Sequence, residues 1–141
     1  MKYSRAWSRY GGFTLMELLV VILIIGLLTG IVAPRLIGQI SRSEVTTARA
    51  QLAALDKALQ SYRIDTGRYP SSSLGLRALT TAPAGEKRWN GPYLQSDVPL
   101  DPWGSAYEYR APGSGGKDYE LMSLGRDRAA GGTGDDADLF I

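Results

Sequence analysis

Four aspartates near the C-terminus are the residues of this chain best placed to do chemistry. They lie in a glycine-rich stretch from residue 125 to residue 138, GRDRAAGGTGDDAD. A hard cation such as calcium takes six to eight oxygen ligands, and a flexible loop can wrap carboxylates and carbonyls around one. The spacing is not that of an EF-hand, and composition alone favours a solvated acidic loop over a metal site.

The composition excludes most other site chemistry. The chain has no histidine and no cysteine, so it lacks the commonest general base, the commonest transition-metal ligand and any thiol nucleophile. Lys2, Arg5 and Arg9 are three of its 16 basic residues, and the charges of the remaining 13 are nearly balanced by 14 acidic residues. Because nucleic-acid binding needs an excess of basic side chains, this balance of charge predicts none. A membrane-anchored enzyme that uses the C-terminal aspartates is the least favoured function, and we expect no catalytic residues.

A single carboxylate, Glu17, interrupts a long apolar run, FTLMELLVVILIIGLLTGIVA, that extends over the 21 residues from 13 to 33. As a helix this run would rise roughly 31 Å, enough to span a bilayer. An ionised carboxylate there costs up to about 2.5–3.5 kcal/mol, so Glu17 either reaches the headgroups or awaits a cation from another chain. An ordinary signal peptide is the rival reading, but its apolar region would be shorter and end in a small-residue cleavage site. The basic leader favours a cytoplasmic N-terminus.

Beyond Pro34 the pattern becomes amphipathic and predicts that one long helix runs from Phe13 to about Thr66. Gly67 is a plausible stop, and Pro70 prevents continuation. Glycines 26 and 30 with Pro34 indicate either a bend or a face for close helix contact. One apolar stripe should pack on the molecule's own sheet, and its members are Val45, Ala48, Leu52, Leu55, Leu59 and Tyr62.

The remaining residues predict a small head. A serine run at 71–73 can cap a short helix that turns Leu76 and Leu79 inward. Strands are predicted at 106–110 and 118–124, joined by a hairpin-like loop at 112–117. A long helix packed on a small antiparallel sheet gives an α+β fold.

The segment from Gly11 to Leu19, GGFTLMELL, follows a short basic leader and resembles the class III signal of type IV pilins and pseudopilins. The resemblance implies that a prepilin peptidase cuts between Gly12 and Phe13 and methylates the new amino group of Phe13. It also implies that Glu17 pairs with the Phe13 amine of a neighbouring subunit. A buried charge would then meet its opposite only on assembly, which gives register as well as attraction.

Passages of the head resemble the major pseudopilin of the type II secretion system, and they are TGRYP at 66–70, GPYL at 91–94, DPWG at 101–104 and YELMSLG at 119–125. The resemblance implies the type IV pilin-like fold and a homopolymeric pseudopilus that exports folded proteins across the outer membrane. Its implied partners are other copies of the chain, prepilin peptidase, minor pseudopilins and the inner-membrane assembly platform. The chain would cross the inner membrane once, with its head in the periplasm. A type IV pilin for adhesion or motility is the alternative, although such pilins usually carry a C-terminal cysteine pair.

The resemblance therefore divides the chain into a leader at 1–12, a transmembrane and assembly helix at 13–34, an amphipathic half at 35–67 and a periplasmic head at 68–141. It also reverses the preference for a solvated loop, because major pseudopilins hold calcium in the matching position. The implied ligands are the carbonyl of Leu124, the side chain of Asp127 and acids among Asp135, Asp136 and Asp138, with the carbonyl of Thr133 as a further candidate. Arg126 and Arg128 depart from the family pattern, in which alanine and glycine are common there.

Overall fold

The computed structural model describes the backbone of residues 12–141, and their side chains except those of residues 32–40 and Asp135. The chain divides into two compact units, residues 1–39 and residues 40–141. The predicted leader falls outside the described residues apart from Gly12.

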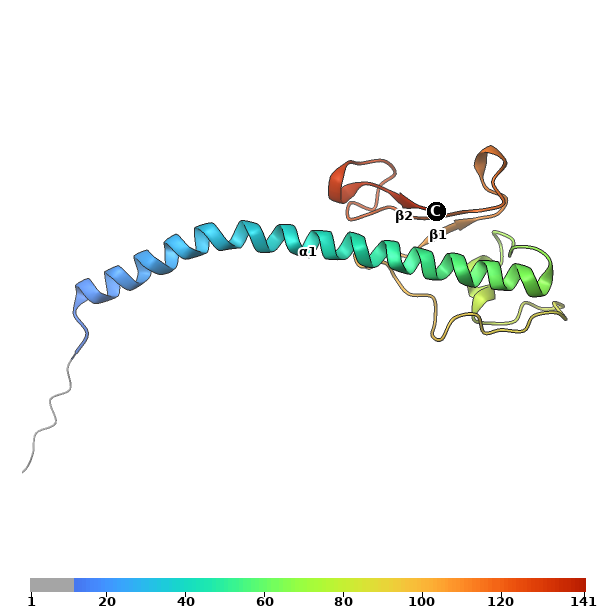
Figure 1. Ribbon diagram of the computed structural model, residues 1–141, viewed down its shortest axis with the longest axis horizontal. Coiled ribbons are helices and arrows are strands. Elements are labelled where there is room, and N and C mark those ends of the chain that lie inside the picture. The colour runs from blue at the N-terminus through green and yellow to red at the C-terminus, as the bar shows by residue number, and fades with distance from the viewer. Residues whose placement is uncertain (1–11) are drawn as a thin grey trace, which may run out of the picture. The chain divides into compact units, whose positions relative to one another are not determined.

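The helix α1 (Leu15–Thr66) supplies residues to both units (Figure 1). Its predicted end is confirmed, because Gly67 follows with φ +83° and donates its N–H to the carbonyl of Arg63 at 2.7 Å. Only glycine adopts that backbone conformation without steric cost. The guanidinium of Arg88 donates to the carbonyl of Thr66 and so satisfies another group at the helix end.

In the first unit, the described side chains from Phe13 to Ile31 are all exposed, and most of them are large and apolar. Among the described residues, no helix combines the length and the apolar character needed to cross a membrane.

The second unit holds a three-stranded antiparallel sheet in the order β1 (Glu108–Arg110), β2 (Glu120–Ser123) and β3 (Leu139–Phe140). Tyr109 lies opposite Leu121, and Met122 lies opposite Phe140. The two predicted strands are confirmed with shorter bounds, and the loop between them contains the short 3-10 turn η2 (Ser114–Gly116). β3 was not predicted.

The predicted apolar stripe of α1 forms the core of this unit. Leu52, Leu55 and Leu59 are at most 1% exposed, and Leu121 of β2 is fully buried with them. Burying each such side chain contributes about 1.5–3 kcal/mol before entropy is counted. The remaining buried apolar residues of the core are Ala48, Ala58, Tyr62, Leu76, Ala78, Leu79, Tyr107 and Leu139.

Tyrosine hydroxyls attach the sheet to its surroundings. The Tyr107 hydroxyl donates to Gln51 Oε1 at 2.5 Å, the Tyr119 hydroxyl donates to Asp56 Oδ1, and both acceptors lie on α1. Burial, together with the charge of Asp101, raises the pKa of Tyr107 to about 12. The ring of Tyr107 is therefore buried and that of Tyr119 partly buried, while both hydroxyls stay paired.

The predicted short helix exists as the 3-10 turn η1 (Gly75–Leu79), and Leu76 and Leu79 are buried as expected. The predicted serine cap is wrong, because the residue at the capping position of η1 is Leu74. No side-chain hydrogen bond caps this described segment. Ser72 instead exchanges hydrogen bonds with both backbone groups of Ala111, at 2.9 and 3.0 Å. Serine competes for nearby backbone groups in just this way.

Candidate functional sites: the helix start and the C-terminal loop

The start of α1 is built by Thr14 and Glu17. Thr14 immediately precedes the helix, and its hydroxyl accepts the Glu17 N–H at 3.2 Å. In return, Glu17 Oε2 accepts from the Thr14 N–H at 2.9 Å and from the Thr14 hydroxyl at 3.0 Å. This reciprocal arrangement is a capping box, which satisfies donors that the first helical turn leaves unpaired.

The capping box gives Glu17 a role within its own chain that our sequence analysis missed. The signature Thr-x-x-Glu stands in the sequence at residues 14–17 and could have been recognised there. The box fixes the carboxylate beside the helix N-terminus, where the helix dipole favours a negative charge. Glu17 is exposed in the chain alone.

Phe13, on the far side of Thr14, is 82% exposed. The predicted cleavage position between Gly12 and Phe13 therefore lies just outside the helix.

The second half of the C-terminal loop, residues 125–138, is closed by contacts between Gly131 and Asp138. Asp138 Oδ2 accepts the Gly131 N–H at 2.9 Å, and the Asp138 N–H donates to the Gly131 carbonyl at 3.2 Å. Between them lies the 3-10 turn η3 (Gly134–Asp136). Asp127 makes a local contact, in which its Oδ1 accepts the Ala129 N–H at 3.0 Å.

One carboxylate oxygen of this loop fits the expectation of a cation ligand. Asp138 Oδ1 is buried, and no donor from the described part of the chain reaches it. A buried carboxylate oxygen without a partner is costly, and a cation would relieve that cost. Among the described residues, no three acidic side chains come together as metal ligands would. The side chain of Asp135 lies outside the described part.

The loop is attached to the sheet through a buried carboxylate. Asp101 is 4% exposed, and its Oδ2 accepts from the Ser123 hydroxyl at 2.6 Å. Its Oδ1 accepts the N–H groups of Trp103 and Ser105 at 3.2 and 2.7 Å. The Ser123 hydroxyl in turn accepts the N–H of Gly125, the first residue of the loop, at 3.3 Å. One chain of hydrogen bonds thus connects Asp101 to the base of the loop.

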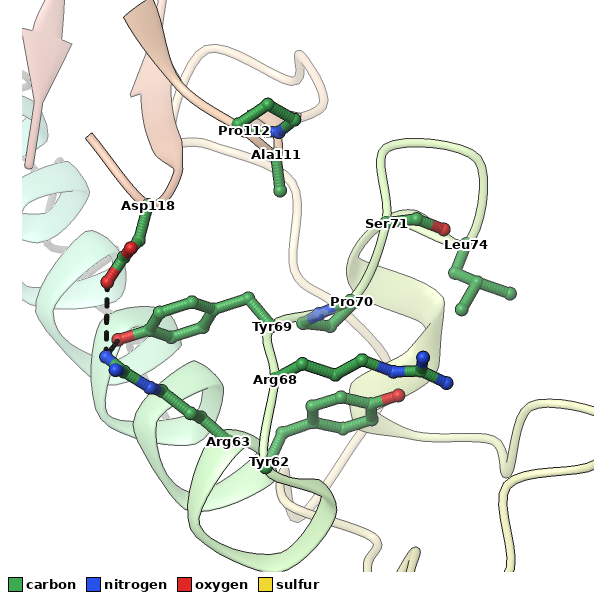
Figure 2. Close-up of a pocket in the computed structure, with 11 residues that line it drawn as sticks. Tyr62, Arg63, Arg68, Tyr69, Pro70, Ser71, Leu74, Ala111, Pro112 and Asp118 are labelled. Carbon is green, nitrogen blue, oxygen red and sulfur yellow. Dashed lines mark hydrogen bonds and ion pairs between the residues drawn. The ribbon is translucent and has the colours of Figure 1, made fainter. Parts of the chain in front are cut away.

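A hollow of about 550 Å³ lies on the second unit, and its described lining residues include none from the C-terminal loop (Figure 2). Arg63 Nη1 donates there to Asp118 Oδ2 at 3.1 Å and to the Tyr69 hydroxyl at 3.2 Å, and its guanidinium lies 4.9 Å from the centre of the Tyr69 ring. These contacts explain the arginine as a structural link between α1 and the head. They do not form an acid and base pair.

Comparison with known proteins agrees with this architecture. A family model described as "Type II secretion system (T2SS), protein G" matches residues 35–140, and one described as "Prokaryotic N-terminal methylation motif" matches residues 7–33. Curated relatives named "Type II secretion system core protein G" include one from Pseudomonas aeruginosa, 40% identical over 131 residues that cover 91% of this chain and 92% of the relative. Another, from Escherichia coli K12, is 38% identical and covers 90% of this chain and 89% of the relative.

Among solved structures, the chain is similar to the major pseudopilin of the type 2 secretion system of enterohaemorrhagic Escherichia coli. That match has a TM-score of 0.59 and 32% sequence identity, and it covers 76% of this chain and 93% of the other. It confirms the expected pilin-like α+β fold. Family models and relatives together cover both the helix start and the head, and the chain belongs to the family of type II secretion system protein G, the major pseudopilins.

Proposed function

We propose that this chain is the major structural subunit of a type II secretion pseudopilus and assembles through the start of α1. The observation that carries the proposal is the exposed apolar helix of the first unit, which begins with one capped carboxylate, Glu17. Apolar side chains in such number need either lipid or neighbouring helices around them. The membrane provides the lipid, and a filament of many copies provides the neighbouring helices.

Processing would create the group that Glu17 needs. Cleavage between Gly12 and Phe13 by a prepilin peptidase releases an amine on Phe13, and methylation keeps that amine basic. A carboxylate has about four acceptor positions, so Glu17 can accept from a neighbour's amine while it retains the Thr14 cap. Capping would hold the side chain in one orientation before the neighbour arrives, which lowers the entropy lost on pairing.

The same reading places the chain in the inner membrane with one crossing, a cytoplasmic N-terminus and a periplasmic head. The apolar run from residue 13 to residue 33 and the basic leader support this orientation. The partners would be further copies of the chain, prepilin peptidase, minor pseudopilins and the assembly platform. Successive addition of subunits would move folded proteins outward, and the chain itself would act by pairing and packing and catalyse no reaction.

Calcium binding by the C-terminal loop is part of the proposal. Asp138 would contribute its buried Oδ1, and Asp127, Asp135 and Asp136 would add carboxylate oxygens, with the carbonyls of Leu124 and Thr133. A bound cation would neutralise the acidic loop and fasten it. Because the ion would bind the folded loop only, calcium should raise the melting temperature of the head.

A type IV pilin for adhesion or motility is the second candidate. Long surface filaments would favour it, and short periplasmic filaments favour the pseudopilus. The absence of cysteine from the sequence agrees better with the pseudopilus, since type IV major pilins usually carry a C-terminal cysteine pair.

The test is Glu17→Gln. Glutamine also completes a capping box, so this substitution keeps the helix start and removes only the charge. We expect the variant to reach the membrane at wild-type levels and to lose sheared pseudopili and export of secreted protein. Thr14→Val is the matched control, because it disrupts the cap and keeps the charge. Pseudopili of Glu17→Gln in wild-type quantity would show that the charge is not the means of assembly.

A further inference from the structure

A second set of contacts holds the C-terminal loop to α1, and it involves no aspartate of the loop. Glu44 lies on α1, and its Oε2 accepts from Arg126 Nη2 at 2.8 Å and from Trp103 Nε1 at 3.1 Å. Arg126 stands 82 positions from Glu44 in the sequence. One carboxylate oxygen therefore joins three separate segments, namely the helix, the loop at 101–105 and the C-terminal loop.

Arg128 adds a third contact to this set. Its Nη2 donates to the carbonyl of Trp103 at 2.9 Å. Its backbone has φ +59°, a left-handed conformation that glycine adopts more readily than arginine. The position therefore carries a long cationic side chain despite an unfavourable backbone, and that side chain reaches the same tryptophan that Glu44 holds.

We propose that Glu44, Trp103, Arg126 and Arg128 form a clasp that fastens the C-terminal loop to α1 without a metal ion. Each contact joins groups that keep their charge or polarity whether or not calcium is present. The clasp stands on these distances alone and does not depend on the calcium site proposed above. It gives the loop a fastener that needs no calcium ion, so the head should keep its loop docked when calcium is scarce.

The clasp is stronger than an ordinary surface ion pair, because the Glu44 carboxylate is partly buried and is shared by two donors. The side chain of Glu44 is only 28% exposed and that of Arg126 is 44% exposed. Exposed ion pairs contribute little because water and salt screen them. Here the carboxylate is partly shielded and accepts two donors, and hydrogen bonds to charged groups are about twice as strong as neutral ones.

Hydrogen exchange of the loop tests the clasp in the full-length chain in detergent. Exchange of residues 126–134 is followed by mass spectrometry with calcium and with excess chelator. In chelator, Glu44→Ala should increase the exchange rate of this segment about tenfold, because loss of a charge-assisted contact raises the open population by about that factor. Glu108→Ala, which removes an exposed carboxylate from β1, is the control and should change the rate less than twofold.

Arg126→Ala provides a second variant that alters only a partly exposed side chain, and it should also exchange about tenfold faster. Arg126→Lys should recover only part of the protection, since lysine lacks the planar guanidinium. The clasp is refuted if Glu44→Ala and Arg126→Ala both exchange at the wild-type rate in chelator. If calcium slows exchange in none of the chains, the proposed metal site fails and the clasp remains.

Discussion

The buried carboxylate of Asp101 should be the most sensitive single position of the head. Asp101→Ala removes the acceptor of three donors at once, which are the N–H groups of Trp103 and Ser105 and the hydroxyl of Ser123. Each donor left unsatisfied in a buried place costs about 1–3 kcal/mol. Relaxation and water entry recover part of this, so we expect a loss of about 3 kcal/mol in the free energy of unfolding.

A loss of that size is easily measured in a unit of this length. The second unit spans residues 40–141, and for a domain of about 100 residues each 1 kcal/mol lowers the melting temperature by about 4–8 °C. Asp101→Ala should therefore melt more than about 10 °C below the wild type. Tryptophan fluorescence suits the assay, because Trp89 and Trp103 report the head in a detergent-solubilised full-length chain.

Asp101→Asn is the matched control, because it preserves shape and replaces the charge. Its carbonyl oxygen can still accept the Trp103 and Ser105 N–H groups, and the Ser123 hydroxyl can rotate to accept from the new amide. We expect this variant to lose only about 1 kcal/mol. The reasoning is wrong if Asp101→Ala melts within about 2 °C of the wild type, or if alanine and asparagine cost the same.

Three further predictions concern pH, a glycine and calcium. Burial raises the pKa of Tyr107 from 10 to about 12, so its contribution to stability is complete below pH 10 and is lost as pH rises to about 12. Between pH 10 and pH 12, the free energy of unfolding from denaturant titrations should fall by about 2–3 kcal/mol less for Tyr107→Phe than for the wild type. Parallel curves for the two proteins would contradict the burial of Tyr107. Gly132→Ala should destabilise the loop by at least about 2 kcal/mol more than Gly131→Ala does, because both have positive φ but only at Gly132 would a Cβ lie 2.2 Å from the Asp136 carbonyl oxygen. Equal melting temperatures would refute this. Calcium should raise the wild-type melting temperature and leave that of Asp138→Asn nearly unchanged, and an identical rise in both would count against Asp138 as a ligand.

Much of the helix could be predicted from local pattern. The spacing of Leu52, Leu55 and Leu59 gave the buried face of α1, and Gly67 gave its end, because helical periodicity and stop residues act within a few positions. The same locality made the Thr14–Glu17 capping box predictable, since its signature lies within four residues.

The parts that were missed depend on contacts between distant residues. β3 has only the two residues Leu139 and Phe140, too few for an alternating pattern, and its pairing with β2 decides that it is a strand. The serine cap failed because Ser72 found a partner in Ala111, 39 positions away. Preference for a cap is local, and a tertiary contact outweighed it.

The candidate sites divide in the same way. Resemblance indicated the motif around Asp101 but neither its burial nor its hydrogen bond with Ser123 of β2. The loop aspartates were visible in the sequence, whereas the unpaired buried oxygen of Asp138 and the clasp at Glu44 emerge only once the chain is folded. The leader, the membrane crossing and the calcium ligands remain predictions.

Intact mass of the chain extracted from bacterial membranes tests the central claim most directly. A processed pseudopilin subunit should give the mass of residues 13–141 plus one methyl group on Phe13. Peptide sequencing would place that methyl group on the new amino terminus. A mass that corresponds to a chain starting at Met1, or at any residue beyond Ala33, would contradict assembly through Phe13 and Glu17.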